Sequence, residues 1–158
     1  MKKLNFGCGT DYKNGWVNLD FDGGVKTDVA FDINSIYQGN QIPFKDKTFD
    51  YIILYDVLEH FIDPLPILRE LYRVCKVDGI INIKVPINSW VWDNPQHQRQ
   101  FTQYSFDVKN FSQYGSQEEE VELIYKKKYI LPSRNLLFAW GRWVFKKHNL
   151  EIKFRRLK

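Results

Sequence analysis

Two glycines and an aspartate near the start of the chain have the types and spacing of a ligand-binding turn. Gly7 and Gly9 follow a short apolar run, and Asp20 ends the next one. Glycine permits a positive φ and lets a ligand approach the backbone without meeting a Cβ. A carboxylate at residue 20 can accept two hydrogen bonds from the neighbouring hydroxyls of a ribose. The alternative is a plain strand-to-loop turn with a surface aspartate, because two glycines alone are a weak signal.

A dinucleotide site is the first functional class to compare with this turn. Its motif, G-x-G-x-x-G, requires a third glycine that opens a helix. The chain has Tyr12 at that position, and the letters "DYKNG" indicate a turn. The sequence therefore favours a ligand that has a ribose but no pyrophosphate.

A second group of candidates lies in residues 94–106, "NPQHQRQFTQYSF". His97 is the candidate general base, because histidine is the side chain most often used to move protons near neutral pH, with a loop histidine bonded to backbone as the alternative. Nearby aromatic side chains would line an acceptor pocket or belong to the core: Trp90, Trp92, Phe101, Tyr104 and Phe106. No CxxC motif and no sequence cluster of Cys and His indicates a metal site, so no metal is expected.

The elements that must position these residues follow from the apolar pattern. Strands are expected over residues 3–6, 16–20, 28–32, 49–54, 80–86 and 121–131, and in the final "NLEIKFRRLK". A helix is expected over residues 63–76, with Asp63 capping its first turn, Pro64 near its start and Gly79 ending it. Its expected apolar stripe is Leu65, Leu68, Leu71, Tyr72 and Cys75. A second, aromatic helix is expected over about residues 135–147. Strands that alternate with helices predict an α/β fold with a largely parallel sheet.

Composition predicts one globular domain over residues 1–158, with 44% hydrophobic residues and no apolar run of the roughly 20 residues that cross a bilayer. Only two cysteines are present, and no signal-type stretch follows Met1, so a cytoplasmic location is expected. Residues 124–158 hold 11 Lys and Arg against one acidic residue. This basic segment leaves binding to nucleic acid or an anionic surface as an alternative function.

In order along the chain, "LNFGCGT", "GWVNLD", "FDI" and "IPFKDKTFDYIILYDVLEHFIDPLPILRELYRVCKVDGIINIKVP" resemble the class I S-adenosylmethionine-dependent methyltransferases. The resemblance is strongest to the small methyltransferase type 11-like branch and covers roughly residues 4–86. It implies a Rossmann-like, mostly parallel seven-stranded sheet with a reduced set of helices near the N-terminus. It also implies S-adenosyl-L-methionine as the cofactor.

The resemblance assigns a role to each matching residue. Gly7, Cys8 and Gly9 would lie against the methionine part of the cofactor, and Asp20 would hold the ribose. Asp32 and Ile33 would border the adenine, while Tyr55 and His60 would flank the methionine end or the methyl group. The alternatives are a cap before Asn34 for Asp32, edge packing for Tyr55, and packing under Phe61 for His60.

Departures from the family pattern and the absent acceptor motifs shape the expected function. Asn5 stands where the family commonly has an acidic residue, which leaves a non-catalytic relative as an alternative. No NPPY or DPPY tetrapeptide is present, so a small-molecule or glycan acceptor, methylated at oxygen, is favoured over an amino group. Nucleic acid is not the expected partner.

The first connections are unusually short for parallel strands. Only about residues 7–15 and 21–27 join the first three strands, so these crossovers must be loops rather than helices. Part of one sheet face should then lack its own helices, with the segment of residues 134–148 as a substitute cover. The alternative is that this segment packs where the late helix of the resembling family packs. An uncovered face or surplus exposed aromatics would favour a homodimer.

Overall fold

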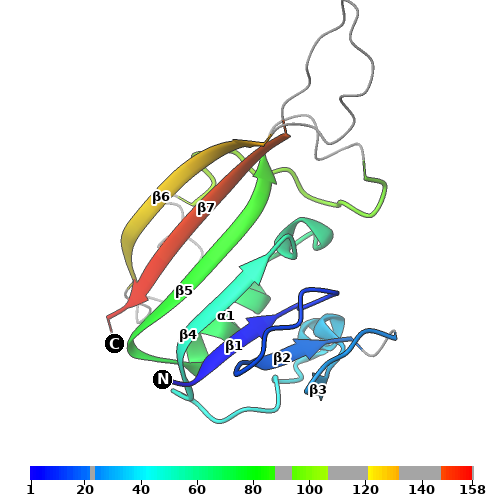
Figure 1. Cartoon of the computed structure of the whole chain (residues 1–158), viewed down its shortest axis with the longest axis vertical. Helices are drawn as coiled ribbons and strands as arrows, with labels where there is room; N and C mark the ends of the chain where they lie inside the picture. The colour runs from blue at the N-terminus through cyan, green and yellow to red at the C-terminus, as the bar shows by residue number, and fades with distance from the viewer. Residues whose placement is uncertain (22–23, 88–93, 107–120, 132–146, 158) are drawn as a thin grey trace, which may run out of the picture.

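The computed structural model describes residues 1–21, 24–87, 94–106, 121–131 and 147–157. Seven strands form one sheet in the order β3-β2-β1-β4-β5-β7-β6 (Figure 1). Their bounds are β1 Lys3–Phe6, β2 Val17–Asp20, β3 Val29–Ala30, β4 Phe49–Tyr55, β5 Cys75–Ile87, β6 Val121–Leu131 and β7 Lys147–Arg156. Strands β3, β2, β1, β4 and β5 are parallel to one another, and β7 is antiparallel to both of its neighbours. The prediction of a Rossmann-like, mostly parallel α/β sheet is confirmed.

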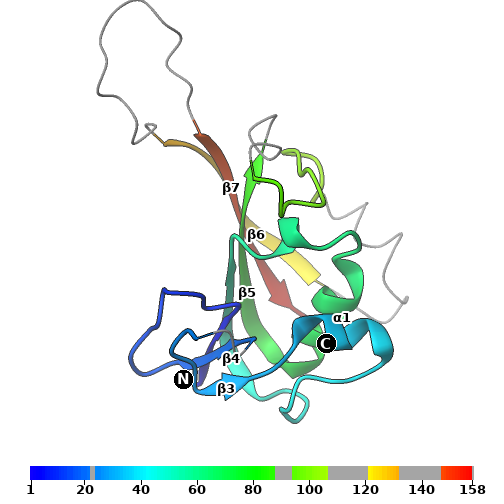
Figure 2. The same ribbon diagram turned by 90° about the vertical axis from the view of Figure 1, so that its right-hand side faces the viewer.

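The helices of the described residues are few and short: η1 Ile33–Gln38, η2 Leu58–His60 and α1 Leu65–Val74. Figure 2 shows them on one side of the sheet. Between them and the strands lies an apolar core that includes Leu4, Phe6, Ile52, Leu54, Ile67 and Leu71. None of the helices in the described part of the chain is long and apolar enough to cross a membrane.

Helix α1 is shorter than predicted. The Asp63 carboxylate accepts from the Leu65 N–H at 3.0 Å, as expected of a capping residue. The prediction that Gly79 ends the helix is wrong, because the chain becomes extended at Cys75, which pairs with Phe49. Gly79 lies within β5, where an added Cβ would be 2.7 Å from the Cys75 Sγ. The buried apolar residues of α1 are Ile67, Leu71 and Val74, so of the expected stripe within α1 only Leu71 is fully buried.

The other expected elements differ mainly in length. The strand expected over residues 28–32 has only two residues, and the one expected over 80–86 begins at Cys75. The helix expected over residues 135–147 lies almost entirely outside the described residues. Trp90 and Trp92 also lie outside the described residues.

A loop without a helix joins β1 to β2, as predicted, and the two strands are parallel neighbours. The fully buried side chain of Asn18 organises this loop. Its Oδ1 accepts from Asn5 Nδ2 at 3.0 Å and from Lys13 N at 2.9 Å. Its Nδ2 donates to Lys13 O at 3.0 Å and to Asp28 Oδ2 at 2.8 Å. A polar network thus does the positioning that a crossover helix would otherwise do.

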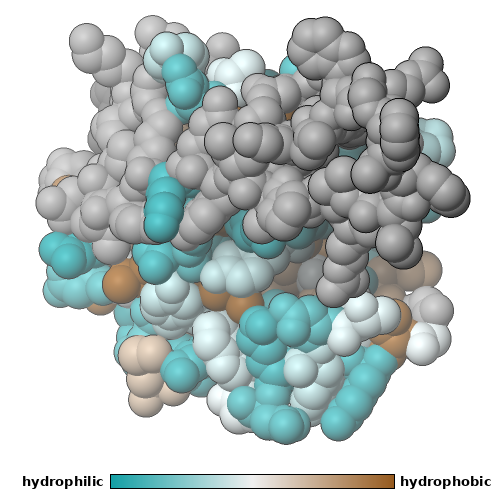
Figure 3. Space-filling view, turned by 45° about the horizontal axis from the view of Figure 1, so that its top comes forward, coloured by the Kyte–Doolittle hydropathy of each residue, from teal (hydrophilic) through white to brown (hydrophobic). Residues whose placement is uncertain are grey.

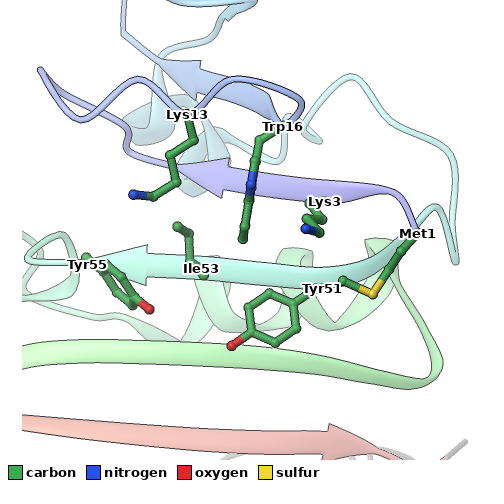
Figure 4. A pocket seen from close by; sticks show the side chains of 7 residues that line it. All are labelled: Met1, Lys3, Lys13, Trp16, Tyr51, Ile53 and Tyr55. Carbon is green, nitrogen blue, oxygen red and sulfur yellow. The ribbon is translucent and has the colours of Figure 1, made fainter.

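The sheet face opposite α1 carries aromatic and charged side chains over β1 and β4. Trp16 packs edge-on against Tyr51, with ring centroids 5.9 Å apart, and the Lys3 ammonium lies 5.1 Å from the Trp16 ring. With Met1, Lys13, Ile53 and Tyr55 they line a groove (Figure 4). On the side seen in Figure 3, hydrophobic residues (brown) are visible in several separate places among the described residues. Amphipathic side chains therefore cover part of the face that the short crossovers leave without helices.

Candidate functional site

The turn after β1 contains two glycines with left-handed backbones that meet different surroundings. Gly7 has φ 67° and Gly9 has φ 49°. A Cβ at Gly7 would lie 2.5 Å from Val57 Cγ2, whereas one at Gly9 would meet no described residue within 4 Å apart from its chain neighbours. Gly7 is therefore required for packing, while Gly9 leaves open space beside its backbone. That space is the feature expected where a ligand approaches the main chain.

Asp20, at the end of β2, lies directly beside Gly9. Its Oδ2 accepts from the Gly9 N–H at 2.6 Å, and its Oδ1 accepts from the Phe21 N–H at 2.7 Å. Each carboxylate oxygen can accept a further hydrogen bond, and the residue is only partly buried. The structure thus joins the glycine turn to the predicted ribose-binding carboxylate. The open Gly9 backbone and this carboxylate fit a cofactor that carries a ribose.

Asp32 and Ile33 follow the short strand β3, and their side chains have local roles. The Phe31 N–H donates to Asp20 O at 2.9 Å, which brings the start of η1 to the end of β2. Asp32 Oδ1 accepts from Asn34 N at 2.9 Å and so caps η1, as the alternative to adenine binding predicted. Ile33 is buried in the core. Contact of either residue with an adenine stays a prediction.

The side chains of Cys8 and Tyr55 contact other parts of the protein, and both stay protonated at neutral pH. The Cys8 thiol is buried and lies 3.8 Å from Lys26 O; burial, and then the nearby Asp20, raises its pKa. The Tyr55 hydroxyl lies 2.7 Å from Asn82 Nδ2, and burial raises its pKa to about 12. Its ring lines the groove on the face opposite α1 (Figure 4). Neither group is therefore charged at neutral pH.

His60 and His97 are 37 residues apart in sequence, yet their rings pack edge-on with centroids 4.9 Å apart. The buried Glu59 joins them, with its Oε1 4.0 Å from His97 Nε2. Burial, and then the nearby His97, lowers the pKa of His60. The structure thus places the candidate base beside a predicted cofactor residue. Sequence reasoning gave Glu59 no role, although the tetrapeptide "VLEH" contains it.

The remaining residues of 94–106 separate into core and surface. Phe101 and Phe106 are buried and stack with centroids 5.1 Å apart, so they belong to the core, as the alternative predicted. Tyr104 is exposed. The exposed Arg99 donates from Nη1 to Ile62 O at 2.7 Å, which fastens this segment beside η2.

Asn5 and Asn18 hold the glycine turn in place, and sequence reasoning gave no role to Asn18. Asn5 is buried, and its Nδ2 donates to Asp11 O at 2.8 Å as well as to Asn18. Hydrogen bonds from the Asn18 side chain and from the Tyr12 hydroxyl, at 2.7 Å, lower the pKa of Asp28. The available signal was an asparagine inside each of two apolar strands, because a buried amide must find partners.

Comparisons with known proteins agree with this architecture. An uncharacterized methyltransferase of Schizosaccharomyces pombe is 42% identical over 55 residues, which are 35% of this chain and 19% of that protein. The aligned part thus spans about a fifth of the curated relative. The solved structure of YcgJ from Bacillus subtilis has a TM-score of 0.64 at 16% identity, covering 99% of this chain and 92% of its own. That of the [4+2]-cyclase SpnF has a TM-score of 0.61 at 14% identity, covering 98% and 74%.

The two solved structures share the fold at low identity and say nothing further about chemistry. The family comparison is more specific, because the sequence model described as a methyltransferase domain matches residues 4–83, from the start of β1 into β5. This range contains the glycine turn, Asp20 and His60, so the resemblance noted in the sequence is confirmed. The chain belongs to the methyltransferase domain family.

Proposed function

We propose that the protein is an S-adenosylmethionine-dependent methyltransferase that acts on a small-molecule or glycan acceptor, at an oxygen atom. The observation that carries the proposal is the pairing of Gly9 with Asp20 at the carboxyl ends of β1 and β2. Ligands of open parallel sheets bind at this edge. Family membership supports the same cofactor.

The residues around this pairing have separate tasks. Asp20 would accept from the ribose hydroxyls while its bonds to Gly9 and Phe21 keep the carboxylate in place. The open space at Gly9 would admit the methionine part of the cofactor. Asp32 and Ile33 would border the adenine, and His60 with Tyr55 would flank the other end. Gly7 and Cys8 would contribute through the backbone, since the Cys8 side chain is buried.

When bound, S-adenosylmethionine supplies an activated methyl group, so the protein's work is to align the acceptor and exclude water. An acceptor hydroxyl would also need a base, for which His97 is the candidate. His97 lies next to Glu59 and His60, beyond the end of β4. Asn94 Nδ2 lies 3.2 Å from its Nε2, so this nitrogen faces a donor in the present arrangement.

The alternative is a cofactor-binding relative without methyl transfer. The observation in its favour is Asn5, whose amide is occupied by the loop and cannot pair with the cofactor's ammonium group as an acidic residue would. SpnF, a [4+2]-cyclase of similar fold, shows that this architecture is compatible with other reactions. Both functions share the binding site, and turnover distinguishes them.

Calorimetry with S-adenosylhomocysteine tests the binding site. We expect measurable binding, and Asp20→Ala should weaken it by about 1.5–3 kcal/mol through loss of charge-assisted hydrogen bonds. Because Asp20 also holds the turn, the melting temperature and circular dichroism of the variant must show a folded protein. No binding to the intact protein would contradict the proposal, and binding of NADH instead would restore the dinucleotide class. A screen of hydroxyl acceptors with labelled S-adenosylmethionine then tests turnover.

A further inference from the structure

Glu59, His60 and His97 bring three metal-binding side chains together beyond the end of β4. One ligand atom from each lies within 4.8 Å of the other two. Glu59 and His60 belong to η2, and His97 lies in the segment of residues 94–106. The spacing of 37 residues between the histidines explains why no sequence motif indicated a site.

Main-chain hydrogen bonds join the two segments at Glu59. The N–H groups of Gln98 and Arg99 both donate to Glu59 O, at 2.8 and 3.1 Å. The Arg99 guanidinium adds its bond to Ile62 O. These contacts to Glu59 O and Ile62 O fix the segment that contains His97 beside η2. Such preorganisation is what a binding site requires of its supporting shell.

The orientation of His60 matches that of a metal ligand. Its Nδ1 lies 3.3 Å from Gln96 O, so this nitrogen carries the proton and donates to the carbonyl. The lone pair is then on Nε2. Histidines that bind metals almost always donate their other ring N–H in this way, which fixes the tautomer and the ring. This bond is independent of the clustering and indicates the same use.

Burial of the Glu59 carboxylate adds an electrostatic argument. Glu59 is 1% exposed, and taking a carboxylate out of water is costly unless a cation or strong donors compensate. His97 Nε2 lies 4.0 Å from Glu59 Oε1, so the two atoms are close enough to approach one ion together. A divalent cation between the carboxylate and the two imidazoles would add a favourable charge interaction to this buried group.

We propose that Glu59, His60 and His97 bind one divalent transition-metal ion of the zinc class. Two imidazoles and a carboxylate form a typical three-ligand zinc set, which leaves a fourth position open to water or to an oxygen of a bound ligand. Ligand atoms around such an ion lie about 3.3 Å apart, so the side chains must draw together by up to about 1.5 Å. His97 Nε2 would exchange its contact with Asn94 for the ion.

This inference does not depend on methyl transfer, and it assigns His97 a different task from that of a base. An imidazole nitrogen that holds an ion cannot also remove a proton. The ion would instead join the segment of residues 94–106 to η2 beyond the end of β4.

Titration of the intact chain with zinc chloride, followed by calorimetry, tests the proposal. We expect one ion per chain with a dissociation constant in the micromolar range or below. Glu59→Gln, His60→Gln and His97→Gln should each weaken binding at least tenfold. Asp78→Asn is the matched control, because it is an exposed acidic residue with φ 62°, a conformation that asparagine tolerates. It should bind zinc like the unmodified protein.

The melting temperature gives a second measure of zinc binding. Zinc should raise the melting temperature of the unmodified protein and of Asp78→Asn, but not that of His97→Gln. If the buried Glu59→Gln does not fold, His97→Gln alone decides, because His97 lies in a surface segment. Absence of zinc binding, or undiminished binding by a folded His97→Gln variant, would overturn the proposal.

Discussion

Replacing Gly9 by alanine should separate ligand binding from folding. The backbone at Gly9 has φ 49°, and a left-handed conformation costs an alanine about 1–2 kcal/mol. Alanine also reduces the conformational entropy of the unfolded chain, which returns about 0.4–1 kcal/mol. Apart from its chain neighbours, no atom of the described residues lies within 4 Å of the added methyl group. The free energy of unfolding should therefore fall by only about 1 kcal/mol.

Binding of S-adenosylhomocysteine should respond far more strongly. The added methyl group occupies the open space that we assign to the cofactor, so Gly9→Ala should weaken binding at least tenfold in calorimetry. Gly39→Ala is the strain-matched control, because Gly39 has φ 87°, also faces open space, and ends η1. It should lose similar stability in urea unfolding and bind the ligand normally.

Gly7→Ala completes the comparison. Its Cβ would overlap Val57 Cγ2 at 2.5 Å in addition to the strain of φ 67°. Overpacking costs about 1–3 kcal/mol, so the total loss should be about 2–4 kcal/mol. If Gly9→Ala binds the ligand normally, the glycines serve only the turn and the assigned site is wrong. If Gly39→Ala weakens binding equally, the effect of Gly9→Ala is strain rather than contact.

The remaining predictions concern the polar network and the assembly. Asn18→Ala should lower the free energy of unfolding in urea by about 3 kcal/mol, because it removes partners of buried groups of Asn5 and the loop. Replacing the exposed Asn40 by alanine should change this free energy by less than about 0.5 kcal/mol, and equal losses in the two variants would refute the role of the network. Asp28 has a pKa below its ordinary value, so the stability it contributes is present above the unfolded-state pKa of about 3.9 and is lost as the pH falls toward its pKa in the folded protein. Asp28→Asn should therefore reduce the loss of stability below about pH 4, and an unchanged loss at low pH would contradict this. Light scattering at micromolar concentration should give about twice the chain mass if the expected homodimer forms, whereas a clean 19.0 kDa species would exclude it.

The strands were predictable from the sequence because their apolar residues alternate or run continuously over short stretches. Lys3–Phe6 and Val121–Leu131 have the expected bounds. The end of α1 was not predictable from local signals. Gly79 has the type of a helix stop, but pairing of Cys75 with Phe49 gains ladder bonds and burial four residues earlier. Tertiary pairing therefore outweighed the propensity signal.

The candidate site was predictable only where its residues adjoin in sequence or follow the ends of strands. Gly9 and Asp20 meet because parallel strands place their carboxyl ends at one edge of the sheet. The contact of Glu59 with His97 depends on how the segment of residues 94–106 folds back, and no periodicity encodes that path. Polarity alone could have drawn attention to Asn5 and Asn18, since buried amides demand partners.

The short first crossover also explains why binding and stability should be linked in this chain. A helix after the glycine turn would hold the turn through its own backbone bonds and apolar face. Here Asn18 does so through its side chain, from within β2 and two residues before Asp20. Loss of Asn18 would therefore loosen both the loop that contains Gly9 and the strand that presents Asp20. A variant of Asn18 that still folds should bind S-adenosylhomocysteine more weakly, although the Asn18 side chain is itself buried inside the protein.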